Sequence, residues 1–210
     1  MEIGATKAVQ DRLKTTKIEE SKGASFVFCW DTHLTKIRGR NVLFIVNASN
    51  RYAIAMTDIE PRNWNYYTMY ISRVIHGVMQ EMGYSEDQIG QYFIMSGDTT
   101  VTKTHGRKSV GGINRMVMDA QYFGKKLEKE AKYQWELSEY LNRDICQPEG
   151  FDAYGYPSEL FKLDMERLGI ATKRKPAKVI DFTRHIDTNR STNPVSYTHL
   201  RAHETKANLV

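Results

Sequence analysis

Short apolar segments rich in β-branched and aromatic residues occupy the first third of this chain and predict strands. Turn residues separate the later segments at Arg38–Asn41 and at Asn47–Asn50. Because tight turns join neighbouring strands that run in opposite directions, we expect an antiparallel meander. The expected strands are Ser25–Trp30, Thr32–Ile37, Asn41–Val46 and Arg51–Met56.

Helical periodicity dominates the rest of the chain. A long helix is expected from Pro61 to Gly83, and a capping-box pattern at Ser85–Gln88 opens a shorter one. The apolar face of the long helix consists of Trp64, Tyr67, Ile71, Val74, Val78 and Met82. Other helices are expected at Thr6–Thr16, from Ser109 to Leu141 with a bend at Gly124, and at Glu159–Leu168. The pattern therefore predicts an α+β domain, in which the long helices pack on one face of a small antiparallel sheet.

Cations gather between a predicted strand and a predicted helix within Asp98–Met116. Ser109 is placed as the helix cap, and unpaired backbone N–H groups at a helix start favour an anion. The sequence therefore predicts a phosphate or carboxylate site. Its expected residues are Lys103, Thr104, His105, Arg107, Lys108, Ser109, Gly111 and Asn114. The alternative is a capped helix whose cations are solvated or pair with acids such as Asp98.

A second group of cations lies on the turns of the predicted meander. Lys36, Arg38, Arg40 and Arg51 could form a basic lip that meets a polyanion. The same residues could instead protect an exposed edge strand from pairing, which is the commoner role of such cations. Among the aromatic residues, Trp30 and Tyr67 are predicted to be core residues rather than base-stacking platforms.

Catalytic and metal-binding signals are weak. The Gly-Arg-Lys-Ser109 string lacks the earlier glycine of a Walker loop, and no hydrolase elbow surrounds Ser109. His33, His76 and His105 show no metal-ligand spacing, so we expect no metal and no cofactor. Asp31 and His33 could form an acid–base pair on one face of a strand.

Charge is distributed unevenly over the 210 residues, whose formal net charge is +5. Residues 1–170 contain 22 Lys and Arg and 22 Asp and Glu, so the positive excess lies in the last forty residues. A neutral body argues against a general nucleic-acid coat. We expect one domain at 1–170 and a basic arm at 171–194. Residues 195–210 resemble translated sequencing-adapter read-through, so we expect an artefactual or disordered tail.

Cys29 and Cys146 are far apart and do not form a disulfide framework, which fits a reducing cytoplasm. The longest apolar run, at 42–46, is too short to span a bilayer, so we expect no membrane association. No signal segment is recognised at the start of the sequence.

Two motifs stand out along the chain. The first is Asn47, Asn50, Arg51 and Tyr52, and the second is Thr102, Lys103, Thr104, Arg107, Ser109, Val110, Gly111 and Asn114. Together they resemble a family of small bacterial proteins of unknown function that are often carried by phages and plasmids. This sequence has Arg115 where the resemblance leads us to expect an acid.

The resemblance implies a mobile-element protein, and the cation-rich helix start implies a bound anion. We expect a non-catalytic binding protein whose partner is a nucleotide, a nucleic acid or a host protein. Counteracting host defence is one role that this expectation includes. One alternative is a phosphate-ester enzyme that uses His105 and Arg107. Another is an interaction module that forms a homodimer through the Trp64–Met82 helix.

Overall fold

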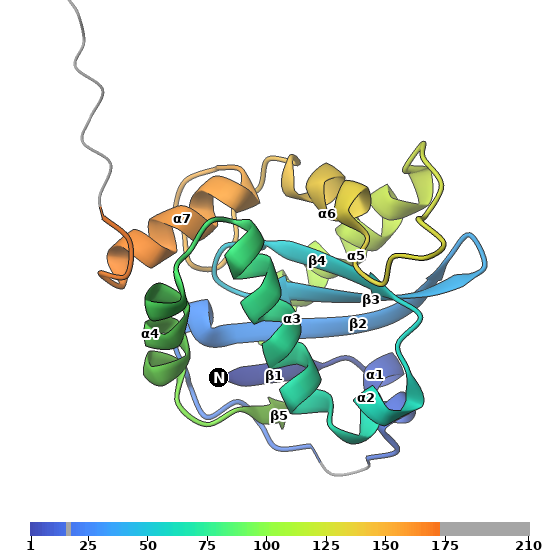
Figure 1. The fold of residues 1–210 in the computed structure, drawn as a ribbon, viewed down its shortest axis with the longest axis horizontal. Coiled ribbons are helices and arrows are strands. Elements are labelled where there is room, and N and C mark those ends of the chain that lie inside the picture. The colour runs from blue at the N-terminus through green and yellow to red at the C-terminus, as the bar shows by residue number, and fades with distance from the viewer. Residues whose placement is uncertain (16–17, 173–210) are drawn as a thin grey trace, which may run out of the picture. The chain divides into compact units, whose positions relative to one another are not determined.

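Five strands form one sheet in the order β4-β3-β2-β1-β5 in the computed structural model, which describes residues 1–15 and 18–172 (Figure 1). The strands are β1 (Glu2–Ala5), β2 (Cys29–Ile37), β3 (Arg40–Asn47), β4 (Ala53–Thr57) and β5 (Thr100–Thr102). The meander β2-β3-β4 is antiparallel, whereas β1 runs parallel to both β2 and β5. The predicted α+β class is confirmed, but the sheet is mixed rather than purely antiparallel.

The parallel part of the sheet arises from a strand that the sequence pattern did not indicate. β1 is short and lies between β2 and β5. Its residues are buried on both faces, so they show no alternation of apolar and polar positions. The two strands expected at 25–30 and 32–37 are in fact a 3-10 turn, Phe26–Phe28, followed by the single strand β2. The predicted arm (171–194) and tail (195–210) lie outside the described residues, except for residues 171 and 172.

Helices cover both faces of the sheet, so the expectation that they pack on one face was wrong. Their bounds are α1 Lys7–Leu13, α2 Pro61–Asn65, α3 Tyr67–Glu81, α4 Glu86–Ser96, α5 Arg107–Tyr122, α6 Trp135–Asn142 and α7 Pro157–Arg167. Leu43 and Ile45 of β3 pack in a core with α3, α4 and α7. Val42, Phe44 and Val46 alternate with them along β3 and pack in a second core with α5 and α6. In Figure 1, α3 lies in front of the sheet and α5 lies behind it.

The helix expected from Ser109 to Leu141 is interrupted between α5 and α6 because its later residues complete the edge strand β4. Asn142 accepts a hydrogen bond from Ala53 N and donates one to Ala53 O, each at 2.8 Å. The Ser138 hydroxyl accepts from Ala55 N at 3.0 Å, and Gln134 N donates to Ala55 O at 2.9 Å. A polar stripe on α6 thus satisfies backbone groups that an open sheet edge would expose.

The helix expected from Pro61 to Gly83 is divided at Tyr66 into α2 and α3. Its apolar face packs on the sheet, where Tyr67, Ile71, Ile75 and Val78 are buried. This face is therefore used inside the domain and is not free to meet a second copy. The predicted capping box is confirmed at the start of α4, where Ser85 and Gln88 bond reciprocally.

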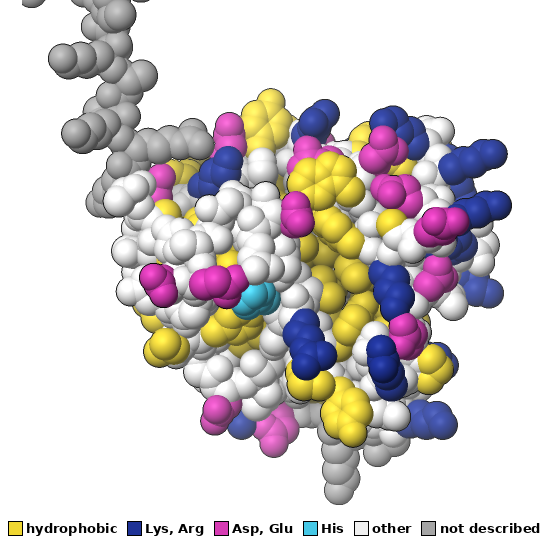
Figure 2. All heavy atoms as spheres, in the orientation of Figure 1, with side chains coloured by type: hydrophobic (Ala, Val, Ile, Leu, Met, Phe, Trp, Pro, Cys, Tyr) yellow, Lys and Arg dark blue, Asp and Glu magenta, His cyan; other side chains and the backbone are white. Residues whose placement is uncertain are grey.

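Charged side chains of both signs are interleaved on the face that α3 covers (Figure 2). This agrees with the equal numbers of acidic and basic residues in 1–170. Among residues 1–15 and 18–172, no helix has the length and apolar content that crossing a bilayer requires.

Packing on both faces of β3 predicts that truncation toward either helical layer destabilises the protein. We expect Phe44→Ala to lower the free energy of unfolding by about 3–5 kcal/mol and Ile45→Ala to lower it by about 2–5 kcal/mol. Met118→Ala, on the exposed side of α5, is the control and should change it by about 0.5 kcal/mol or less. Urea unfolding measures all three values. A wild-type midpoint for Phe44→Ala or Ile45→Ala would contradict this two-layer core.

Candidate functional site

A buried hydrogen-bond network connects the ends of β1 and β2 with the start of α5. The His105 imidazole lies between two carboxylates: Nδ1 is 2.7 Å from Asp31 Oδ1, and Nε2 is 3.0 Å from Glu2 Oε2. The His105 backbone N–H also donates to the Asp31 carboxylate at 3.2 Å, and the Ser109 hydroxyl donates to Asp31 Oδ2. All three ionisable side chains are at most 6% exposed.

Two neighbouring features hold the carboxylates in place. Glu2 accepts hydrogen bonds from the Ser21 hydroxyl at 2.6 Å and from Lys22 N at 2.8 Å. Gly4 leaves the space that Asp31 fills, because a Cβ at position 4 would lie 1.8 Å from Asp31 Oδ1. The network thus depends on one loop and on one residue without a side chain.

The charge state of the network follows from its hydrogen bonds. Carboxylates only accept, so an imidazole between two of them donates from both nitrogens and is the imidazolium. Burial alone would lower the pKa of His105, but hydrogen bonds and charge from Asp31 and Cys29 raise this pKa to about 10. Burial raises the pKa of Glu2, yet the bonds from Ser21, Lys22 N and His105 outweigh it and lower that pKa overall.

This network occupies part of the anion site that the sequence predicts at the start of α5. The helix begins at Arg107 with Gly106 as its N-cap, so Ser109 is not the cap. The Ser109 hydroxyl and the His105 N–H bind the protein's own Asp31, and Val110 N donates to Gly106 O within the helix. Val110 therefore has no free N–H for an external ligand.

The other residues of the predicted anion site do not converge on one pocket, because they differ in partners and in exposure. Lys103 pairs with Glu20, and Lys108 Nζ donates to Pro148 O at 3.2 Å. Thr104 is half-buried. The remaining three, Arg107, Gly111 and Asn114, lie on the exposed side of α5.

The cations of the predicted basic lip lie at opposite ends of β3. Lys36, Arg38 and Arg40 are at the β2–β3 turn, whereas Arg51 is at the β3–β4 turn. Arg38 donates to the carbonyls of Phe123 and Lys125, and Arg40 to those of Glu128 and Lys129. These two arginines thus connect the segment between α5 and α6 to the sheet through hydrogen bonds.

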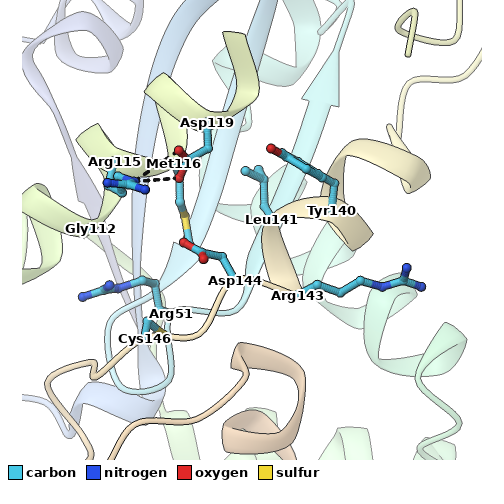
Figure 3. A pocket seen from close by; sticks show the side chains of 10 residues that line it. All are labelled: Arg51, Gly112, Arg115, Met116, Asp119, Tyr140, Leu141, Arg143, Asp144 and Cys146. Carbon is cyan, nitrogen blue, oxygen red and sulfur yellow. Dashed lines mark hydrogen bonds and ion pairs between the residues drawn. The ribbon is translucent and has the colours of Figure 1, made fainter. Parts of the chain in front are cut away.

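Arg51 instead lines a pocket between α5 and α6 with a volume of about 300 Å³. Its lining residues are Arg51, Gly112, Arg115, Met116, Asp119, Tyr140, Leu141, Arg143, Asp144 and Cys146 (Figure 3). Arg51 and Arg115 extend to the same side, the Asp144 carboxylate lies near Met116, and Arg143 points away (Figure 3). Arg115 pairs with Asp119, and Arg143 pairs with Glu139.

The β3–β4 turn places Arg51 with unusual backbone geometry. Asn47 Oδ1 accepts from Ser49 N and Asn50 N, and Asn50 Oδ1 accepts from Tyr52 N. These bonds hold Arg51 at a φ of 61°, in the left-handed region that residues other than glycine rarely adopt. Gly112 makes room for its guanidinium, because a Cβ there would lie 2.6 Å from Arg51 Nε.

Sequence reasoning missed one member of the buried network, Glu2, and assigned another, Asp31, to a different partner. Asp31 contacts His105 rather than His33, and His33 Nδ1 instead lies 3.1 Å from Thr6 Oγ1. Glu2 was not singled out, because nothing near it in the sequence marks it as buried. The alternation along β2 predicts that Asp31 lies on a face of the sheet, but it cannot identify the partner, His105, which is distant in the sequence. Trp30 and Tyr67 are buried, as predicted.

The fold and site define a class: an α+β protein whose mixed sheet holds a buried carboxylate–imidazolium network beside an arginine-lined pocket. The chain belongs to the family described as "Domain of unknown function (DUF6933)", which matches residues 2–160. This match includes every residue of the network and of the pocket. No match to the chain was found among curated proteins or among solved structures.

The contact between Gly4 and Asp31 predicts the effect of adding a methyl group at that position. Gly4→Ala should lower the free energy of unfolding by about 1–3 kcal/mol, because the carboxylate must move out of a filled space. Gly111→Ala is the matched control: its Cβ meets open space, and the helix should gain about 0.5–1 kcal/mol. Thermal unfolding distinguishes the two. Equal stability of both variants would contradict the packing of Asp31 against Gly4.

Proposed function

We propose that this protein is a non-catalytic binding protein for a small phosphate-bearing ligand of the nucleotide type, held in the pocket between α5 and α6. The proposal rests on the surroundings of the Arg51 side chain. Its guanidinium lines the pocket and has no hydrogen-bond or ion-pair partner in residues 1–15 and 18–172. A cation that is positioned but not neutralised is suited to an anionic ligand.

The backbone of Arg51 supports a binding role. A residue other than glycine in the left-handed region costs about 1–2 kcal/mol, and such strain is typical of ligand-binding positions. The hydrogen bonds of Asn47 and Asn50 enforce this conformation. Gly112 then admits the guanidinium beside α5, where Arg115 supplies a second guanidinium, whose Nε is bonded to Asp119. Two guanidinium groups on one side of a pocket can bind a phosphate through several N–H donors.

The rest of the pocket favours a nucleotide over a bare phosphate ion. Tyr140 is 44% exposed and offers a ring on which a base can stack. The Asp144 carboxylate, also without a side-chain partner among the residues described, can accept hydrogen bonds from ribose hydroxyls or an amino group. Met116 and Leu141 supply an apolar floor. The volume of about 300 Å³ lies at the lower end for small-molecule pockets, which fits a mononucleotide better than a polymer.

The geometry gives less support to the alternative of a phosphate-ester enzyme. The His105 side chain is 1% exposed and is fixed between two carboxylates, whereas Arg107 is on the surface. These two residues do not face a common cavity among those that the structure describes. The resemblance to phage and plasmid proteins implies that the protein belongs to a mobile element. In that case, the role that we propose is to counteract host defence by sequestering a nucleotide signal.

Removing the Arg51 side chain should separate binding from stability. We expect Arg51→Gly to weaken nucleotide binding roughly 10-fold to 100-fold, the loss of one charged hydrogen-bonding group. Because glycine adopts a positive φ freely, the free energy of unfolding should stay within about 1 kcal/mol of wild type. Isothermal titration calorimetry with adenosine and guanosine monophosphates, the matching nucleosides and inorganic phosphate measures the affinities.

Two further variants sharpen this experiment. Gly112→Ala should also weaken binding, since its methyl group displaces the guanidinium without changing charge. Arg62→Ala, which removes an exposed arginine outside the pocket, should leave binding unchanged. The proposal fails if no nucleotide binds the wild-type protein, or if Arg51→Gly binds as the wild type does.

A further inference from the structure

We infer that Glu2, Cys29 and His105 form a binding site for a zinc ion, beneath the 19–25 loop and separate from the arginine-lined pocket. One carboxylate oxygen, the thiol sulfur and one imidazole nitrogen lie within 4.8 Å of one another, and all three residues are buried. Zinc bonds of about 2.0–2.3 Å place the ligand atoms of a tetrahedral site roughly 3–4 Å apart. The three groups therefore need only small movements to share one ion.

The orientation of His105 is the second observation that points to a metal. Asp31 accepts from Nδ1 at 2.7 Å, which directs Nε2 toward Glu2 at 3.0 Å. A carboxylate behind the imidazole is the usual outer partner of a metal-bound histidine, because it fixes the tautomer and the ring orientation. Binding of an ion to Nε2 would displace the proton that this nitrogen donates to Glu2.

The fold provides this site from three segments that are distant in sequence. Glu2 is on β1, Cys29 begins β2, and His105 lies between β5 and α5. The parallel pairs β1–β2 and β1–β5 align Glu2 with Cys29 and with Thr100. An ion bound here would join the two parallel pairs at one end.

The ligand set selects the metal by chemistry. One thiolate, one imidazole and one carboxylate suit a borderline ion such as zinc rather than magnesium or calcium, which prefer oxygen ligands alone. Three protein ligands leave one tetrahedral position for water or for the Ser21 hydroxyl, which lies 2.6 Å from Glu2 Oε2. An ion would reach the site through the covering loop, whose residues Ser21, Lys22 and Gly23 are exposed.

Cobalt replacement tests this site directly on the 210-residue chain without an affinity tag. Co²⁺ takes the place of zinc, and a thiolate ligand gives it an intense charge-transfer absorption in the near ultraviolet. Cys29 and Cys146 are the chain's two cysteines, so Cys146→Ser leaves Cys29 as the sole thiol. We expect one Co²⁺ per chain with this absorption in the wild type and in Cys146→Ser, and its loss in Cys29→Ser.

Zinc affinity provides the second measurement. Glu2→Gln and Cys29→Ser should each weaken zinc binding roughly 10-fold or more, at least the loss known for outer partners of metal ligands. The same zinc concentration should raise the melting temperature of the wild type and of Cys146→Ser by more than it raises that of Cys29→Ser.

The inference is overturned if the wild type binds no zinc at one equivalent. It is also overturned if Cys146→Ser lacks the thiolate absorption or if Glu2→Gln binds zinc as the wild type does. If Cys29→Ser does not fold, the Cys146→Ser spectrum still decides the question.

Discussion

One buried carboxylate, that of Asp31, links the parts of this protein that the sequence separates most widely. It accepts from the His105 imidazole, the His105 backbone and the Ser109 hydroxyl, and through His105 it connects to Glu2. Burying a charge is costly unless it is paired, and breaking such a pair typically costs about 3–5 kcal/mol. The position of α5 relative to β1 and β2 therefore depends on Asp31, and Asp31 in turn depends on the absence of a side chain at Gly4.

The internal use of this helix start has a consequence for function. A helix N-terminus favours an anion, and here the anion near it is the protein's own carboxylate. The site that we propose for an external ligand lies farther along α5, at Gly112 and Arg115, where Arg51 approaches from the β3–β4 turn. The network fixes the helix at its start, and the pocket uses the helix one to two turns later. The structural role of α5 and the binding role that we propose for it are thus separated along its length.

Local patterns predicted the elements whose cause is local. The capping box at Ser85 and the burial of Trp30 and Tyr67 were predicted because propensity and amphipathicity determine them. β1 was not, since a short strand buried on both faces has no alternation. The interruption between α5 and α6 was also missed, because Ser138 and Asn142 bond to β4 rather than to their own helix. His105 and Asp31 lie 74 positions apart, so only the sheet order brings them together. The sequence shows the cluster of cations in Asp98–Met116. Only the fold shows that Lys103 and Lys108 bind partners within the protein.

The most direct measurement is the location of nucleotide binding along α5. Backbone amide chemical shifts of the ¹⁵N-labelled protein, recorded during titration with adenosine and guanosine monophosphates, report it residue by residue. We expect the largest changes at Arg51, Gly112 and Arg115, with small changes at Arg107–Ser109, where Asp31 is bound. Changes centred on Arg107–Ser109, or no changes with either nucleotide, would contradict a ligand site built around Arg51.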